Sequence, residues 1–244
     1  MAREDRGRRV DLMGVRSVWL PVWVAVPLLC FGLASLALAG TWAVLVRAPE
    51  ERVMGLSQKI FYFHVPSAIA AYSGFVLVGL SSAAYLWTRR RFYDQWAHAG
   101  AEVGVVFTLI VLVTGPIWGR PAWGVWWSWD PRLTSTLILF LIYLGALVLR
   151  GSIPDPDRAA RLCAVLGILG LVDIPIIHKS VEWWGGIHPG PLLKSGGLGP
   201  EMKQAFFVMF AAWMALFSGL VLLRVRLRVL EDVAAERRAE GGAA

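Results

Sequence analysis

The chain has 244 residues, of which 57% are hydrophobic and 17% are charged, and its formal net charge is +7. An average soluble domain is about 45–50% apolar and about 25% charged, and the apolar excess here lies in long runs without charge. Runs of about 17–25 apolar residues can cross a bilayer as helices. The composition therefore excludes a soluble enzyme, a disordered chain and a disulfide scaffold. It also excludes a β-barrel, whose strands would be short and alternating.

The apolar runs predict an all-α, polytopic membrane protein whose six transmembrane helices form one domain over residues 1–244. The predicted spans are roughly 20–46, 65–88, 98–117, 133–149, 160–177 and 204–224. Arg, Gly and Pro mark short turns after the second and fourth spans. Longer loops, including 118–132 and 178–203, lie on the other side. Because binding residues are often carried by loops on a rigid scaffold, we expect the functional site there.

Most of the 24 Lys and Arg residues lie on the side of the short turns, if the chain crosses the membrane six times. They fall in the segments 1–17, 88–97, 150–161 and 224–244. The positive-inside rule then predicts that this side, with both termini, is cytoplasmic. The basic charge indicates contact with anionic membrane lipids, and we expect no nucleic-acid partner.

Five of the 13 tryptophans crowd into the predicted loop 118–132, and they are Trp118, Trp123, Trp126, Trp127 and Trp129. Tryptophan favours the membrane–water interface, so one interpretation is an aromatic belt. A second is a platform of rings that stacks on a large, flat ligand. The spacing of Trp126 and Trp129 also predicts a shared face of a short interfacial helix on the outer surface.

Three segments carry a resemblance to a known family. WGVWWSWDPRLT, at 123–134, resembles the tryptophan-rich WWD signature of membrane proteins that handle haem during cytochrome c maturation. KIFYFHVPSA, at 59–68, and SVEWWGGIHPG, at 180–190, resemble the two histidine-bearing segments of the haem exporter protein C (CcmC) family. The three occur in the family's order and span most of the chain.

The resemblance implies a protein of the bacterial cytoplasmic (inner) membrane that holds haem b, as transported ligand, at the periplasmic face. It implies delivery of haem to the chaperone CcmE for c-type cytochrome biogenesis. The implied partners are the transporter subunits CcmA and CcmB and the small membrane protein CcmD. The chain has no GxxxxGK[ST] phosphate loop, so we expect no enzyme activity and ATP hydrolysis only in a partner. Alternatives are a haem-lyase-like enzyme of the same superfamily and a b-type haem redox protein.

By the same resemblance, His64 and His188 match the family's axial haem ligands. Haem iron accepts imidazole nitrogen. His64 lies at the start of a span, where the helix dipole favours the neutral imidazole that binds metal. His188 lies among Gly and Pro residues, which suggests a fixed ligand and a mobile one whose release opens haem to the chaperone. His178, on the same side, is the competing candidate.

Other polar and aromatic residues complete the expected site. Arg132 is the first choice to pair with the haem propionates, with Arg120 and Lys59 as alternatives, although Lys59 suits a headgroup anchor better. Asp130 would orient Arg132 or a Trp N–H. Trp183 and Trp184 would add two rings.

Two acidic residues lie outside that site. On the opposite side, His98 precedes Glu102 by four residues, so the two can pair on one helix face. Asp173, within a span, has no evident partner in the sequence.

Overall fold

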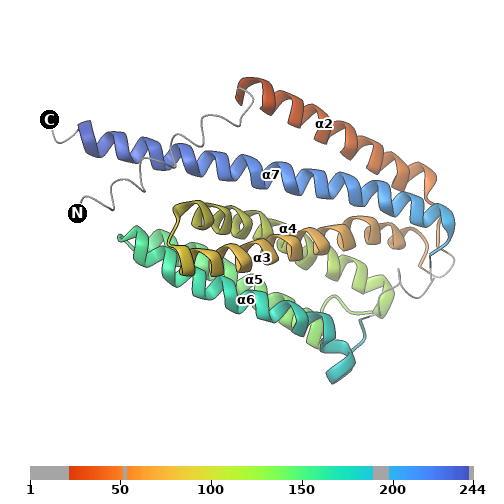
Figure 1. Ribbon diagram of the computed structural model, residues 1–244. Helices are drawn as coiled ribbons and strands as arrows, with labels where there is room; N and C mark the ends of the chain where they lie inside the picture. The colour runs from red at the N-terminus through yellow and green to blue at the C-terminus, as the bar shows by residue number, and fades with distance from the viewer. Residues whose placement is uncertain (1–21, 52–53, 189–197, 242–244) are drawn as a thin grey trace.

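The computed structural model describes residues 22–51, 54–188 and 198–241, and these residues form a bundle of long helices (Figure 1). The helices are α2 (Val22–Trp42), α3 (Phe61–Thr88), α4 (Arg91–Trp123), α5 (Pro131–Ser152), α6 (Pro156–Trp184) and α7 (Pro200–Gly241). A π-helical turn, Ala43–Arg47, and a 3-10 turn, Leu56–Ile60, lie between α2 and α3. Across the described ranges there is no strand, apart from one bridge between Glu51 and Gly55.

All six of these helices are long and apolar enough to cross a membrane. The prediction of an all-α, multi-pass membrane protein with six spanning helices is therefore confirmed. The segments 1–17 and 189–197, which carry part of the predicted charge and of the last outer loop, lie outside the described residues.

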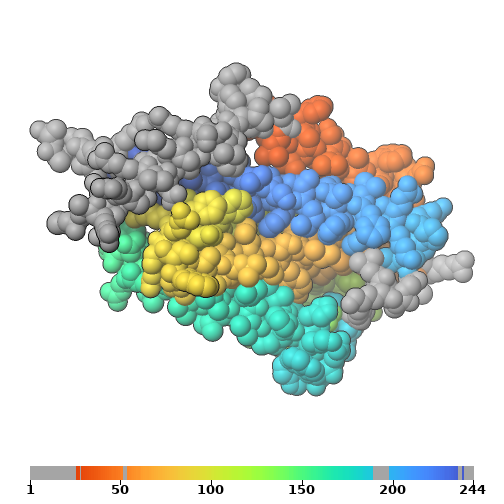
Figure 2. All heavy atoms as spheres, viewed as in Figure 1, coloured from red at the N-terminus to blue at the C-terminus, as the bar shows by residue number. Residues whose placement is uncertain are grey.

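The bundle consists of a pair, α2 and α7, and a group of four helices, α3 to α6 (Figure 1). α3 packs against α4 and α6 within the group, and it also contacts α7 of the pair. The ends of α4 and α6 and the starts of α3 and α7 lie at one end of the bundle, which we call the tryptophan end. The end of α3 and the starts of α4 and α6 lie at the other, which we call the basic end. The last turns of α6, coloured teal, project from the tryptophan end (Figure 2).

Small residues bring α3 and α4 into close contact. A Cβ atom at Gly74 would lie 3.2 Å from both Gly100 O and Gly104 Cα. Membrane helices associate through such close packing because lipid gives them no hydrophobic driving force. Next to this contact, the rings of Phe75 and Tyr143 stack with centroids 4.0 Å apart, and this links α3 to α5. The close contact makes α3 and α4 a firm support for the residues they carry at the tryptophan end.

The helices run further than the predicted spans, and this corrects the interpretation of both outer loops. α4 continues through Pro116 and Pro121 to Trp123, because membrane helices tolerate proline where neighbours satisfy the freed carbonyl groups. Trp118 and Trp123 are therefore helical. α6 likewise continues to Trp184, so the second loop begins at Gly185 and not at residue 178.

The short helix predicted from the spacing of Trp126 and Trp129 is wrong. Gly124 adopts φ 78° and ends α4, as glycine commonly does at a helix C-terminus. Pro131 then begins α5 and disfavours helical geometry in the residue before it. Residues 124–130 therefore form an irregular connection.

Candidate haem-binding site

A cavity of about 350 Å³ lies between α3, α4 and α5 at the tryptophan end. This volume falls within the range of about 300–1,000 Å³ for small-molecule pockets. Seven of the residues singled out from the sequence line it: His64, Trp118, Trp123, Trp127, Arg132, His178 and His188. Apolar side chains such as Phe75 and Leu139 continue the lining deeper into the bundle. The fold thus brings together three segments that are far apart in the sequence.

His64 lies in the first turn of α3 and is 9% exposed. Its Nδ1 atom lies 2.9 Å from Thr114 Oγ1 on α4. Its ring centroid lies 6.0 Å from that of Trp118, one helical turn beyond Thr114. Both contacts come from one face of α4, which holds the imidazole against the wall of the cavity.

His188 is placed by Asp130 and Arg132. Asp130 Oδ2 accepts hydrogen bonds from the backbone N–H groups of Ile187, at 2.8 Å, and His188, at 3.4 Å. Arg132 Nη1 lies 3.0 Å from His188 Nδ1. Because arginine can only donate, His188 Nδ1 accepts this hydrogen bond. The second histidine is thus tied to the start of α5 through both its backbone and its ring.

Asp130 is the N-cap of α5, since its Oδ1 atom accepts a hydrogen bond of 2.9 Å from Arg132 N. An aspartate followed by proline is a common start of a helix, so this helix start could be predicted from the sequence. Asp130 binds the backbone of Arg132, and an orienting role toward the Arg132 side chain stays a prediction. The contacts to Ile187 and His188 were missed, because they join residues 57 and 58 positions apart.

Arg132 also joins the ends of two helices. Its Nη2 atom donates to His178 O at 3.0 Å, and its Nε atom donates to Ile177 O at 3.4 Å, so it spans from α5 to α6. The two alternative cations do not line the cavity. Arg120 donates to Gly124 O at the end of its own helix, and Lys59 donates to Leu45 O at 3.1 Å.

The tryptophans divide into two sets. Trp118, Trp123 and Trp127 line the cavity, and ring contacts of 6.0–6.1 Å run from His64 through Trp118 and Trp123 to His188. The other set points outward: Trp126, Trp129, Trp183 and Trp184 are 59–76% exposed and do not line the cavity. The first set suits a ligand platform, and the second suits an interfacial belt.

His178 and Asp173 are two of the remaining residues that the sequence singled out. His178 lines the cavity from the end of α6 and is exposed, so the geometry leaves it available as a ligand. Asp173 lies on α6 outside the cavity lining, and its buried Oδ2 atom has no hydrogen-bond partner among the described residues.

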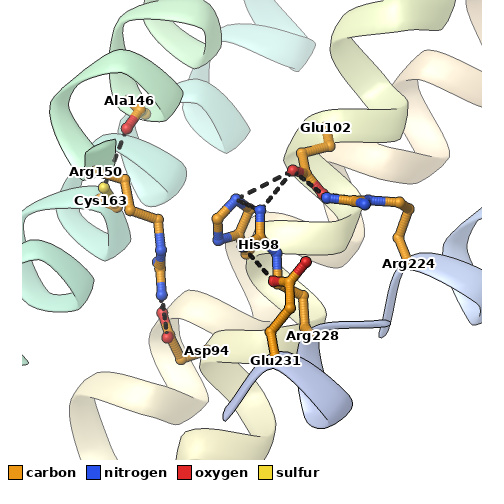
Figure 3. Close-up of polar contacts among 9 residues, drawn as sticks. All are labelled: Asp94, His98, Glu102, Ala146, Arg150, Cys163, Arg224, Arg228 and Glu231. Atoms are coloured by element: carbon orange, nitrogen blue, oxygen red, sulfur yellow. Dashed lines mark hydrogen bonds and ion pairs between the residues drawn. The ribbon is translucent and has the colours of Figure 1, made fainter. Parts of the chain in front are cut away.

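The predicted pairing of His98 with Glu102 is confirmed at the basic end, where His98 Nε2 lies 3.4 Å from Glu102 Oε1. Figure 3 shows that α7 completes this cluster. Arg224 binds Glu102 through two hydrogen bonds of 2.6 and 2.7 Å, and Arg228 Nη2 lies 2.6 Å from Glu102 and 2.7 Å from His98. These contacts between α4 and α7 could not be predicted, because they join residues that are more than 120 positions apart.

Known proteins resemble this chain over most of its length. The family model described as heme exporter protein C matches residues 16–240. The chain is 39% identical to a heme exporter protein C of Bradyrhizobium diazoefficiens, over 89% of this chain and 84% of the relative. It is 38% identical to that of Paracoccus denitrificans, over 83% and 86%, and 36% identical to that of Escherichia coli K12, over 75% of each. The chain therefore belongs to the heme exporter protein C family.

Proposed function

We propose that this protein binds haem in the cavity at the tryptophan end and passes it to the haem chaperone CcmE for cytochrome c maturation. The observation that carries the proposal is the meeting of His64, His188 and Arg132 in one cavity whose other walls are tryptophan rings and apolar side chains. The names of the relatives, heme exporter protein C, support haem as the cargo.

The chemistry of the lining suits haem b. Its macrocycle is flat and apolar and would pack against the tryptophan rings, and its iron accepts imidazole nitrogen. Its propionates need hydrogen-bond donors, which Arg132 can supply as a planar fork. Trp118 and Trp127 line the same cavity, and their buried Nε1 atoms have no hydrogen-bond partner among the described residues.

The two histidines take different roles in this proposal. His64, held by α4, is the fixed ligand. His188 is the exchangeable ligand, because Arg132 donates to its Nδ1 atom and the proton of the neutral ring is then on Nε2. His188 can bind iron through Nε2 only after Arg132 leaves Nδ1. A haem propionate that takes over Arg132 would therefore free His188 to bind.

The exporter name implies a complex with other subunits, and we propose CcmA, CcmB and CcmD as these partners. The protein acts as a delivery subunit and not as an enzyme, with ATP hydrolysis in a partner. It resides in the bacterial inner membrane with both termini cytoplasmic. This orientation places the cavity at the periplasmic face, where the chaperone would receive haem.

An absorption spectrum of the detergent-purified protein tests the proposal. We expect a haem Soret band in the wild type, and loss or a marked shift of that band in His64→Ala and His188→Ala. His178→Ala is the matched control, because His178 lines the same cavity from another element. Transfer to purified CcmE should be lost with the band. A wild type without haem after haem-replete expression would contradict the proposal, and a spectral change in His178→Ala alone would move the second ligand to His178.

A further inference from the structure

Thr114 contacts His64 but has no part in the haem site proposed above. Its Oγ1 atom lies 2.7 Å from Ile110 O, 3.5 Å from Val111 O and 2.9 Å from His64 Nδ1. A hydroxyl has one proton to donate and two lone pairs that accept. Both backbone carbonyl groups can only accept, so the proton of Thr114 is directed to the backbone of α4.

This hydrogen bond favours one tautomer of His64. Thr114 Oγ1 donates to Ile110 O at 2.7 Å and is then placed to accept from the imidazole, which favours the N–H group on His64 Nδ1. In the neutral ring the lone pair is then on Nε2. This is the nitrogen farther from the backbone, and its lone pair is the one a metal needs.

The rest of α4 holds the same ring in one orientation. A Cβ atom at residue 115 would lie 3.4 Å from His64 Cε1, an ordinary van der Waals distance, so the ring packs beside this part of α4. Trp118, four residues after Thr114, packs against the ring with a centroid distance of 6.0 Å. Residues four apart lie on the same helix face, so α4 contacts the ring through both its hydrogen bond and its packing.

We infer that Thr114 is a positioning residue that fixes His64 as an Nδ1–H imidazole, so that Nε2 is ready to bind haem iron. The inference rests on the proposed function for the identity of the ligand. It also explains why the two histidines differ, since Arg132 gives His188 the opposite protonation. Outer hydrogen-bond partners of this kind raise the basicity of a metal-binding histidine.

Thr114→Val tests the inference, because valine keeps the shape and removes the hydroxyl. Losing an outer-shell partner of a metal ligand typically costs about 10–100-fold in affinity. We expect haem affinity to fall at least about tenfold and the reduction potential of bound haem to rise, because a less basic imidazole donates less electron density. Thr114→Ser, which keeps the hydroxyl, should restore both values, and Thr114→Ala, which also lacks it, should behave as valine does.

Thr88→Val is the matched control. Thr88 lies at the basic end of α3 and donates to Ala84 O at 2.7 Å, the same bond to the carbonyl four residues earlier that Thr114 makes. Among the described residues it makes no hydrogen bond with a histidine. We expect this variant to match the wild type in haem affinity and in the reduction potential of bound haem. The comparison separates the loss of the threonine hydrogen bond to its own helix from the loss of the contact with His64.

A second measurement needs no haem. Long-range ¹H–¹⁵N spectra of protein labelled with ¹⁵N-histidine distinguish Nδ1–H from Nε2–H imidazoles, and the His64 signals are those missing in His64→Ala. We expect Nδ1–H in the wild type and in Thr114→Ser, and a shift toward Nε2–H in Thr114→Val.

Two results would overturn the inference: Nε2–H at His64 in the wild type, or a Thr114→Val protein with wild-type affinity and potential. Either can occur while His64→Ala still abolishes the haem spectrum, so the proposed function would stand. A wild type that binds no haem, or a His64→Ala variant with an unchanged spectrum, would instead overturn the proposed function. The NMR measurement would then still decide whether Thr114 sets the tautomer of His64.

Discussion

Arg132 shows how much one side chain organises at the tryptophan end. It reaches two backbone carbonyl groups at the end of α6 and the ring of His188, all from the first turn of α5. The sequence predicts a cation here because an arginine closes the tryptophan segment. It could not predict the partners, because two of them lie 45 and 46 residues away on a helix that was expected to end at residue 177.

Replacing Arg132 with Gln should weaken haem binding by about 10–100-fold, since hydrogen bonds to charged groups contribute about 1.5–3 kcal/mol. Arg132→Lys should restore only part of the affinity, because an ammonium group lacks the planar fork. Haem titration followed by absorption spectroscopy measures both. Arg120→Gln is the control, because Arg120 lies at the same end but donates to the end of its own helix. Equal haem affinities for Arg132→Gln and Arg120→Gln would show that Arg132 does not contact haem.

At the scale of elements, the sequence predicts that each helix exists but does not predict the residues at which it begins and ends. Long apolar runs marked all six helices, but Pro116, Arg120 and Pro121 made α4 look shorter than it is. The same runs say nothing about which faces meet, and this is why the contact of Thr114 with His64 could not be predicted. The density of tryptophans marked the loop 118–132, the family resemblance identified His64 and His188 as ligand candidates, and the helix packing supplies their distances.

The connection after α6 carries His188, the proposed exchangeable ligand. Gly185 has φ 73°, which disfavours a side chain there, and a Cβ atom at Gly186 would collide with the Asp130 carboxylate. Alanine at either position therefore displaces the connection and does not stiffen it. We expect Gly186→Ala to break the contacts of Asp130 with Ile187 and His188 and to speed haem loss several-fold, because His188 is no longer held near the cavity.

Stopped-flow transfer of haem to an apoprotein acceptor measures this rate. Gly199→Ala is the control at the same end of the bundle, because a Cβ atom there meets nothing within 4 Å. Asp130→Asn should act in the same direction as Gly186→Ala, since the amide turns an N–H group toward N–H donors. Haem loss at the wild-type rate from both variants would show that Asp130 does not hold the exchangeable histidine.

At the scale of the whole molecule, the ion pairs of the basic end join α7 to α4. Glu102 receives Arg224 and Arg228 from α7, and Arg150 of α5 binds Asp94 at the start of α4 (Figure 3). Glu102→Gln should lower the free energy of unfolding by about 1–3 kcal/mol, because it leaves two arginines with a weaker acceptor. Glu231→Gln, which removes an exposed pair with Arg228, should cost less than about 1 kcal/mol.

Chemical unfolding in detergent, followed by tryptophan fluorescence, compares the two variants. Haem binding at the other end of the bundle should be unchanged in Glu231→Gln. A stability loss for Glu102→Gln no larger than that for Glu231→Gln would show that the cluster does not fasten α7 to the rest of the bundle.

The separation of the two ends predicts how the molecule lies in the membrane. Arginines dominate the basic end, and the positive-inside rule predicts that this end is cytoplasmic. In the proposed orientation the tryptophan end, with its cavity and its exposed rings, faces the periplasm. A cysteine-free variant, made by Cys30→Ser and Cys163→Ala, allows this to be measured with single cysteines at two exposed positions, Trp129→Cys and Arg90→Cys.

An impermeant maleimide added to intact spheroplasts should label the first cysteine and should label the second only after the membrane is broken. A green fluorescent protein fused to the C-terminus of the full chain should fluoresce, as it does when it remains in the cytoplasm. Labelling at residue 90 in intact spheroplasts would reverse the orientation. The cavity would then open to the cytoplasm, and His64 and His188 would receive haem on the side where it is made, which is incompatible with delivery to a periplasmic chaperone.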